Sequence, residues 1–401
     1  MNPTLKKLLP VLGPGWVVML ADLDAPSVIT AIQSGIEFKA HLIVLLIVLI
    51  IPLFLVQDTS SRIGAVTGKT LGHVISEYFG HGWTVAAVGG TAIIDFAAYV
   101  GEFAGIAVAG TIVGIPVIVT VILVIIVHTI VVSTGKYKRI EIFLVAIGFI
   151  LFLFVALDFF VFPHNIHLTD FSPFIPKNSF YFLIAANIGA VIMPWMLFYH
   201  QAADVDSGLK ISGMKKESLG TLQGAVASEA LMVAIVIFSW KLAQDGLTSG
   251  NSVTNVATAL GHEIGPIGPV IFALALAVAG LLAMFVISMS MAYSVSDVFR
   301  WKGSFNRRVS GHKRFYGVYM MEIIPAAILT VIFTNLINLA LDVMVFSAIA
   351  LALPLLIVIR IGSSREIMGQ HKIGTTRAIS LYIFMILAVG LGVFSILQVI
   401  Y

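Results

Sequence analysis

The 401-residue sequence contains no cysteine, so disulfides, thiolate metal sites and cysteine nucleophiles are excluded. Charge is also scarce, because charged residues make up 11% of the chain, whereas soluble domains carry about 25%. Apolar residues make up 59%, which leaves too few polar side chains to cover the surface of a soluble protein. The net charge of +3 gives no support for a nucleic-acid partner. The composition predicts an all-α integral membrane protein.

Apolar runs between polar segments predict eleven transmembrane helices, at about 20 residues for each crossing of the bilayer. The first run contains Asp22 and Asp24 and lacks a small-residue cleavage site, so we expect a membrane helix there rather than a removable signal peptide. The eleven expected ranges are 12–34, 41–60, 83–110, 112–134, 140–162, 180–203, 219–242, 266–298, 316–335, 339–360 and 378–400.

The distribution of Lys and Arg predicts the orientation of these helices. With the N terminus in the cytoplasm, twenty of the 23 basic residues fall in cytoplasmic segments. The three exceptions are Lys39, Lys177 and Lys241. Because cytoplasmic loops carry the excess of Lys and Arg, we expect a plasma-membrane or inner-membrane protein with a cytoplasmic N terminus and an outside C terminus.

Two prolines predict breaks in the first and sixth helices. Proline removes a backbone donor and disfavours a helical conformation at the residue before it. We therefore expect Pro26 to break the first helix beside Asp24, and Pro194 to break the sixth beside Met193. The breaks fall at matching places in two halves of five helices each. Because five is odd, the second half begins on the opposite side of the membrane and has the inverted topology. The expected organisation is a single transporter domain, 1–401, with repeats at 12–162 and 180–360 and an additional helix at 378–400.

Broken helices at matching positions of inverted repeats indicate the substrate site of a transporter. Unwound carbonyls and the negative ends of half-helices favour a cation there. The candidate ligands are a carboxylate from Asp24, a hydroxyl from Ser27, a carbonyl near Ala190 and a thioether from Met193. The alternative is purely structural, since proline kinks are common in membrane helices and methionine usually serves packing.

Four segments of the chain form a recognisable series. They are 13–35, which begins Gly13-Pro14-Gly15-Trp16, then 62–69, then 189–200, which contains Met193-Pro194 and Tyr199-His200, and 365–369. In this order and topology they resemble the NRAMP family of metal-ion transporters. This resemblance implies a leucine-transporter-like fold of eleven or twelve helices, in which two inverted five-helix repeats have broken first helices. It also implies uptake of manganese or iron by alternating access, usually together with protons.

Several positions depart from the family pattern. The hallmark Asp-Pro-Gly-Asn is Asp-Ala-Pro-Ser here, so Asp24 matches the metal-binding Asp whereas Ser27 stands at the Asn position. The sixth-helix His position holds Trp195, which cannot exchange a proton near neutral pH. In the third helix Asp95 matches a family acid, but the Glu expected three residues later is Ala98. We therefore expect metal-driven acidification to be weak or absent.

Further ionisable residues lie within the predicted helices. Asp95 and Glu102 are seven residues apart and should share one helical face, whereas Asp22 should point away from Asp24. Two interpretations stay open: these residues line a cation or proton pathway, or they are protonated or paired structural acids. His200 is either a proton carrier or a histidine at the membrane interface. The candidate pathway residues are Asp95, Glu102, Glu229, His200 and Asp22.

Ligand chemistry separates the candidate substrates. The Met193 thioether favours a softer ion such as manganese or iron, whereas the extra acids and Ser27 suit a hydrated magnesium ion. Some NRAMP-related branches are associated with magnesium, so an uncoupled magnesium transporter is the alternative. An amino-acid symporter is less favoured because Asp24 repels carboxylates. No enzyme activity or resident cofactor is expected. The expected partners are a divalent metal cation as substrate and the lipid bilayer, with protons as a candidate and no nucleic acid.

Overall fold

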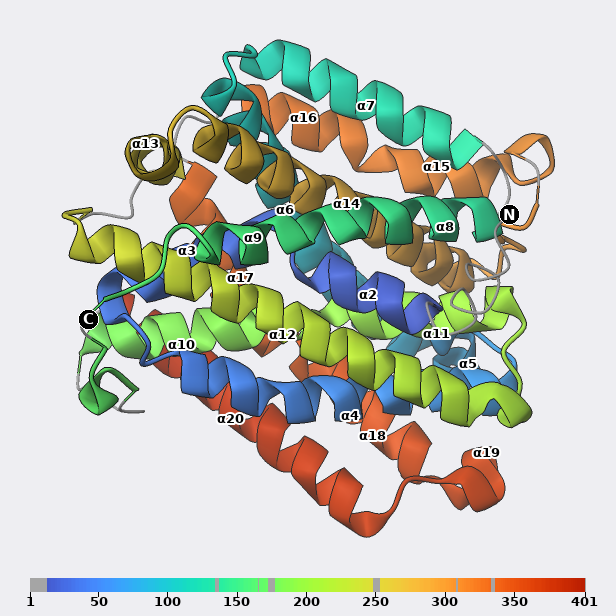
Figure 1. Ribbon diagram of the computed structural model, residues 1–401. Helices are drawn as coiled ribbons and strands as arrows, with labels where there is room; N and C mark the ends of the chain where they lie inside the picture. The colour runs from blue at the N-terminus through green and yellow to red at the C-terminus, as the bar shows by residue number, and fades with distance from the viewer. Residues whose placement is uncertain are drawn as a thin grey trace.

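The computed structural model describes residues 13–133, 137–164, 166–171, 177–247, 253–307, 309–332 and 336–400. Within these ranges the regular structure is helical, with no β-strand. The helices lie side by side in one bundle (Figure 1). The predicted all-α class is confirmed.

The first half of the bundle begins with two short helices where the sequence predicts one. Its helices are α2 (Pro14–Asp22), α3 (Ala25–Phe38), α4 (Ile43–Thr67), α5 (Leu71–Tyr78), α6 (His81–Ile112), α7 (Val117–Ser133), α8 (Tyr137–Gly148), η1 (Phe149–Phe152) and α9 (Leu153–Asp158).

The second half begins in the same way, after a turn of 3-10 helix, η2 (Leu168–Phe171). Its helices are α10 (Asn178–Val191), α11 (Pro194–Ser207), η3 (Ile211–Gly213), α12 (Met214–Gln244), α13 (Val253–Ile264), α14 (Ile267–Val298), η4 (Val309–Gly311), α15 (Lys313–Met321), α16 (Ile323–Ile332), α17 (Leu336–Ala350), α18 (Ala352–Ser363), α19 (Arg365–Met368), η5 (Gly369–His371) and α20 (Thr375–Ile400).

Most of the expected membrane helices are present. Among the described residues, nine helices are long and apolar enough to cross a bilayer, and the pair α2 and α3, bent by 49°, would make a tenth. Helix α7 is apolar but has only 17 residues, so the count of eleven stays a prediction. The two expected long helices, 83–110 and 266–298, are confirmed as α6 and α14, with 32 residues each. The expected helix ends at 12, 134 and 333–335 lie outside the described residues.

Besides the four-residue α19, two helices lie where the sequence predicts only connections. Helix α5 has eight residues and α13 has twelve. Both are too short to cross a hydrocarbon core of about 30 Å. Because the prediction counted long apolar runs, it could not detect helices of this length.

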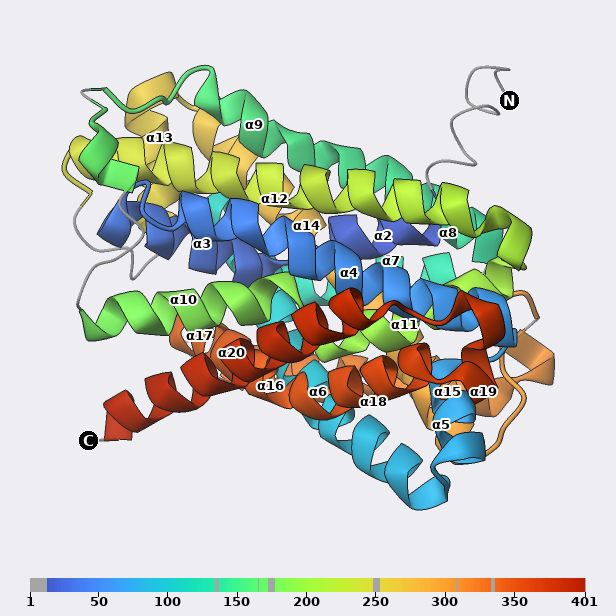
Figure 2. The ribbon, with the colours of Figure 1, turned by 90° about the horizontal axis from the view of Figure 1, so that it is seen from below.

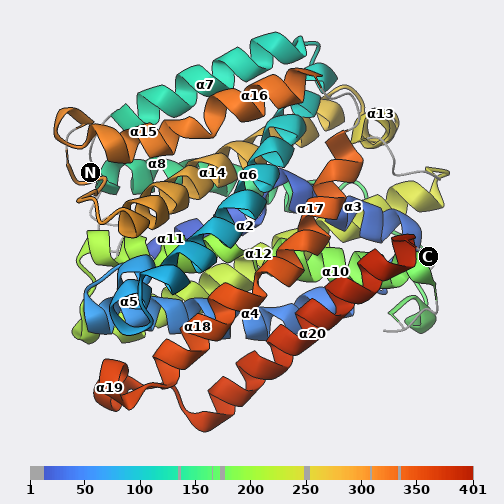
Figure 3. The ribbon, with the colours of Figure 1, turned by 180° about the vertical axis from the view of Figure 1, so that it is seen from behind.

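The contacts between helices repeat in the two halves. Helices α2 and α3 pack on α12, and correspondingly α10 and α11 pack on α4. Helix α2 packs on α8 as α10 packs on α17, and α14 packs on α8 and η1 as α6 packs on α17 (Figures 2 and 3). Each contact is thus matched by one between the equivalent helices of the opposite halves, which are five places apart in the predicted series. This pattern, together with the two broken helices, is the predicted 5+5 inverted arrangement.

Polarity is distributed as in a membrane protein. The outer helices α7 and α20 lie at opposite edges of the bundle (Figures 1 and 3). Large aliphatic side chains such as Ile51, Ile93 and Ile386 are exposed on its surface, whereas Asp24 and Glu102 are fully buried. Acidic side chains within lipid-spanning helices face the interior because lipid does not solvate them. The interior of the bundle is therefore where chemistry is expected.

Candidate metal centre

The first helix breaks where Pro26 predicts. Helix α2 ends at Asp22, α3 begins at Ala25, and Asp24 between them is extended, with φ −84° and ψ 174°. Its Oδ1 atom accepts a hydrogen bond of 2.7 Å from the Ser27 backbone N–H. Asp is a favoured N-cap and proline is favoured in the first helical turn. The sequence therefore starts a new helix here, with a carboxylate at its N-terminus.

The sixth helix breaks beside Met193, as predicted. Helix α10 ends at Val191 and α11 begins at Pro194, while Ile192 and Met193 between them are extended. The backbone N–H of Met193 points at the sulfur of Met196, 3.3 Å away. Sulfur is a weak acceptor, so this break has no strong polar cap.

The two breaks meet inside the bundle. The Ser27 hydroxyl lies 3.4 Å from the Ala190 carbonyl oxygen, toward which it donates. Further along the same pair of helices, the Asn187 amide donates to the Ser34 hydroxyl at 2.9 Å. All four residues are fully buried. The structure thus brings Ser27 and Ala190 together, and Asp24 is joined to Ser27 by a hydrogen bond.

Glu102 of α6 completes the surroundings of the first break. Its Oε2 atom accepts a hydrogen bond of 3.0 Å from the Ala25 backbone N–H, and its charge interacts with that of Asp24. Within the described residues, Oδ2 of Asp24 and Oε1 of Glu102 have no hydrogen-bond donor. Helix α6 approaches this closely because it has glycine there: a Cβ atom on Gly101 would lie 2.9 Å from Cγ of Pro26. Two buried carboxyl groups this close to each other suit a shared proton or a cation.

Trp195 lies beside the Met193 thioether. Its indole Nε1–H donates to the Met193 sulfur at 3.3 Å, and its own carbonyl accepts from the Ser290 hydroxyl at 3.0 Å. The Trp195 side chain is fully buried. The sequence predicts for Trp195 only the loss of a proton carrier, and this contact was not predicted. The indole engages the soft ligand that the sequence assigns to a metal.

Asp22 is the last residue of α2, whereas Asp24 lies within the break itself. Asp22 accepts a hydrogen bond of 3.0 Å from the Ser228 hydroxyl of α12. Its charge also interacts with those of Glu229, the next residue of α12, and Asp24. Neither Glu229 carboxylate oxygen has a hydrogen-bond partner among the described residues. The predicted acids around the first break therefore form a buried group, which is composed of Asp22, Asp24, Glu102 and Glu229.

Asp95 belongs to a different polar group, although it shares an α6 face with Glu102. Its charge interacts with that of Glu322, at the junction of α15 and α16. Tyr99, one turn along α6, accepts from the Ser288 hydroxyl at 3.1 Å and lies 3.3 Å from Nε2 of His128. The sequence analysis grouped Asp95 with Glu102 and missed Glu322. Ala98, the position of an expected family acid, is a buried core residue.

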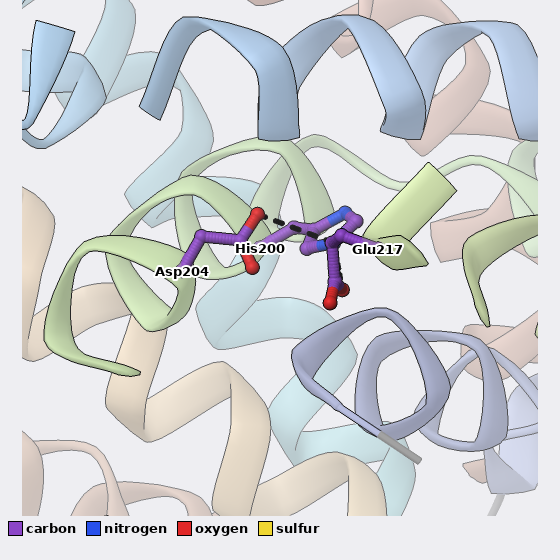
Figure 4. A group of neighbouring side chains, drawn as sticks. All are labelled: His200, Asp204 and Glu217. Carbon is purple, nitrogen blue, oxygen red and sulfur yellow. Dashed lines mark hydrogen bonds and ion pairs between the residues drawn. The ribbon is translucent and has the colours of Figure 1, made fainter. Parts of the chain in front are cut away.

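His200 lies on α11, beyond the break, and is fully buried. Its Nε2 atom is 3.4 Å from Oε1 of Glu217 and 3.6 Å from Oδ2 of Asp204 (Figure 4). Its Nδ1 atom is 3.1 Å from Oε1 of Gln57. The sequence analysis named His200 but missed its three neighbours. The i, i+4 spacing of His200 and Asp204 on one helix was a usable signal, whereas the other two lie on separate helices.

Comparison with known proteins gives a consistent result. Residues 15–398 match the family model described as "Natural resistance-associated macrophage protein-like". The divalent metal cation transporter MntH of Bacillus subtilis is 23% identical over 411 residues, which cover 98% of this chain and 92% of that protein. The metal transporter Nramp6 of Arabidopsis thaliana is 29% identical over 249 residues, covering 58% of this chain and 45% of that protein.

Two solved structures have the same fold. The manganese transporter of Eremococcus coleocola, at 18% identity, has a TM-score of 0.79 and covers 99% of this chain and 88% of its own. The nucleobase-cation-symport-1 transporter Mhp1, at 13% identity, has a TM-score of 0.55 and covers 96% of this chain and 92% of its own. The predicted membership and the leucine-transporter-like class are confirmed: this integral membrane protein belongs to the natural resistance-associated macrophage protein (NRAMP) family.

Proposed function

We propose that this chain is a secondary transporter that carries a divalent metal cation across the membrane by alternating access. The single observation that carries the proposal is the contact of the two breaks at Ser27 and Ala190, beside an Asp24 carboxylate with one free oxygen. The names of the MntH and Nramp6 relatives support a divalent metal as the cargo. The bilayer and the cation are then its two partners, with no enzymatic step.

The proposed metal site uses four groups at the two breaks. Asp24 supplies a carboxylate oxygen, Ser27 a hydroxyl, Ala190 a backbone carbonyl and Met193 a thioether. A carboxylate binds any divalent ion, whereas sulfur adds selectivity for softer transition ions. Manganese or iron is therefore the favoured substrate. The Eremococcus coleocola protein, a manganese transporter of the same fold, is in keeping with this choice.

Magnesium transport without proton coupling is the second candidate, and one contact favours it. The Trp195 indole already donates to the Met193 sulfur, so a metal at this sulfur would compete with that hydrogen bond for its electron density. The acids Asp22, Glu102 and Glu229 around Asp24 would suit an ion that keeps part of its water shell. In this case Met193 is a packing residue.

Orientation and repeat boundaries are part of the proposal. The excess of Lys and Arg in alternate connections supports a cytoplasmic N terminus and an outside C terminus. Repeats at 12–162 and 180–360, with 378–400 added, would then exchange access between the two sides by moving against each other.

Uptake into proteoliposomes tests the proposal directly. Manganese would be added outside, with excess magnesium as competitor, and a trapped dye would record internal pH. Manganese uptake that withstands excess magnesium, with little acidification, is the expected result. Uptake abolished by magnesium, with no pH change, would favour the second candidate. Absence of any divalent cation flux from correctly folded protein would overturn both.

A further inference from the structure

A second group of metal-ligating side chains lies outside the proposed substrate site. His200 and Asp204 are one turn apart on α11, and Glu217 lies in the first turn of α12. One ligand atom from each residue lies within 4.8 Å of the others. The three side chains converge on one point between the two helices (Figure 4). This geometry would allow a single ion to contact all three.

Asp204 is the most informative member of this cluster. Its side chain is 0% exposed, and the charges of Glu217, Glu141 and Asp58 act on it. The Ser61 hydroxyl lies nearby, but within the described residues neither oxygen of Asp204 has a partner in hydrogen-bonding geometry. A buried carboxylate without a partner is unfavourable by several kcal/mol. A positive charge among the three side chains would remove this penalty.

Basic side chains do not provide that charge within the described part of the chain. The two arginines that reach this region, Arg62 and Arg377, both pair with Asp58, at 2.6 Å and 2.5 Å. No ion pair between Lys or Arg and either Asp204 or Glu217 is present there. Both arginines therefore neutralise the charge of Asp58, and the charges of the neighbouring acids Asp204 and Glu217 would need another cation.

Gln57 orients the imidazole for metal binding. A metal on Nε2 of His200 requires the proton to be on Nδ1, and the Gln57 amide oxygen lies 3.1 Å from that atom as an acceptor. Metal-binding histidines almost always donate their other N–H group in this way. With the proton on Nδ1, the Nε2 lone pair faces two carboxyl groups, and a bound cation or a carboxyl proton between them makes this arrangement favourable.

The donor set indicates the class of cation. One imidazole nitrogen and two carboxylate oxygens suit manganese, iron or zinc better than magnesium, which prefers oxygen ligands alone. The Glu217 side chain is 11% exposed, so water can complete the coordination on that side. Its Oε1 atom also accepts a hydrogen bond of 2.8 Å from the Gly15 backbone N–H at the start of α2.

We propose that His200, Asp204 and Glu217 form a second divalent transition-metal site. It lies about 10 Å along α11 from the break at Met193, since a helix rises 1.5 Å per residue. The site joins α11 and α12, and the hydrogen bond from Gly15 to Glu217 links it to the start of α2. An ion there would thus connect the half-helices on one side of both breaks. Its use as a relay for transported metal rests on the proposed function, whereas the binding itself does not.

Electron-spin-echo spectroscopy of bound manganese(II) tests the site on the full-length protein in detergent, without a histidine tag. Manganese bound by imidazole shows modulation from ¹⁴N, whereas the proposed ligands at the breaks include no nitrogen. We expect about two manganese ions per chain and a clear nitrogen modulation. Labelling the unmutated protein with ¹⁵N-histidine should change the modulation to that of ¹⁵N. This measurement does not depend on whether any variant folds.

Variants then assign the signal to residues. His200→Gln and Asp204→Asn should each remove the nitrogen modulation and about one bound ion, whereas His262→Gln, at an exposed histidine of α13, should remove neither. Asp24→Asn should remove one ion and keep the modulation. No nitrogen modulation at saturating manganese, or a modulation unchanged in His200→Gln, would overturn this site. If the proposed transport function is wrong but this site exists, manganese uptake into proteoliposomes would be absent while the ¹⁴N modulation is still observed.

Discussion

The two breaks differ in the chemistry of the groups around them. At the first break, the backbone N–H groups of Ala25 and Ser27 donate to the carboxylates of Glu102 and Asp24. At the second, the N–H of Met193 points at sulfur. Backbone groups freed by a helix break need partners inside a membrane, and the first break meets this need with anionic oxygen. The carboxylates of the proposed metal centre thus lie at the first break. Within the described part of the chain, the second break has no charged group and is held mainly by packing.

Removing the Asp24 carboxylate should have the largest effect on transport. In Asp24→Ala we expect manganese uptake to fall by at least about 100-fold, because loss of outer-shell groups alone costs 10–100-fold in metal affinity. The fold should persist, since the loss leaves Glu102 in place. Uptake into proteoliposomes measures the loss, and thermal unfolding in detergent measures folding.

Asp245→Ala is the matched control for this change, because Asp245 is an exposed acid beyond the end of α12. Its uptake should equal that of the unmutated protein. Normal manganese flux through Asp24→Ala would mean that the charge of the first break has no part in the metal centre.

The second break should be sensitive to volume, as the first is at Gly101. A Cβ atom on Gly189 would overlap the Met344 carbonyl oxygen and lie 2.9 Å from the Ala348 backbone nitrogen. Both are backbone atoms of α17, so α10 would have to move away. We expect Gly189→Ala to lower the free energy of unfolding by about 3 kcal/mol, at the upper end of the usual overpacking cost. Thermal unfolding in detergent checks this.

Gly89→Ala provides the comparison for Gly189→Ala. Nothing lies within 4 Å of a Cβ atom at Gly89, which is within α6. Alanine should raise helix stability there by about 0.5–1 kcal/mol. If the two variants unfold at the same temperature, close packing does not hold the second break.

Local chemistry allowed the breaks to be predicted, since Pro26 and Pro194 act on their immediate neighbours. Long apolar runs similarly predicted α6 and α14, and the spacing of Lys and Arg led to an orientation that stays a prediction. Contacts between distant residues could not be predicted, because no periodicity encodes them. Glu217 and His200 lie on different helices, and only the packing of α11 against its neighbours brings them together.

A side-chain contact between two nearby apolar residues was also missed. Trp195 and Met193 are two residues apart, and a stretch of this kind is typical of packing. The structure shows that the indole is a donor to the sulfur. The same limit applies to Asp95, whose partner Glu322 lies in a part of the chain treated only as an apolar run.

The soft character of the second break can be tested with Met193→Ala. We expect manganese affinity to fall about tenfold and magnesium affinity to change little, because a thioether favours transition ions over magnesium. Competition for uptake gives both values. Met289→Ala, at a fully buried methionine of α14, controls for the lost volume. Equal losses for the two metals would remove the thioether from the ligand set.

The smallest effect is expected where the outer ends of the two broken helices are tied together. Lys39, which follows α3, donates to Asp170, which precedes α10 in the chain, at 3.0 Å. The other oxygen of Asp170 accepts from the His167 backbone N–H at 2.9 Å. That hydrogen bond and the Lys39 charge hold the pKa of Asp170 below its usual value of 3.8. Because the pKa is lowered by folding, the pair stabilises the protein above this value and loses its effect as pH falls through the lowered pKa.

Asp170→Asn should therefore cost about 0.2–1 kcal/mol near neutral pH, since the Lys39 side chain of this pair is 52% exposed, and manganese uptake should stay unchanged. Thermal unfolding of the unmutated protein, Asp170→Asn, Lys39→Gln and the double variant isolates the pair, and repeating it in acid should reduce the difference. A loss of uptake in Asp170→Asn would contradict the expectation that the ion pair at the helix ends does not affect transport at the two breaks. It would mean that this link positions the two breaks against each other, so that charge at one break and packing at the other do not suffice to build the metal centre.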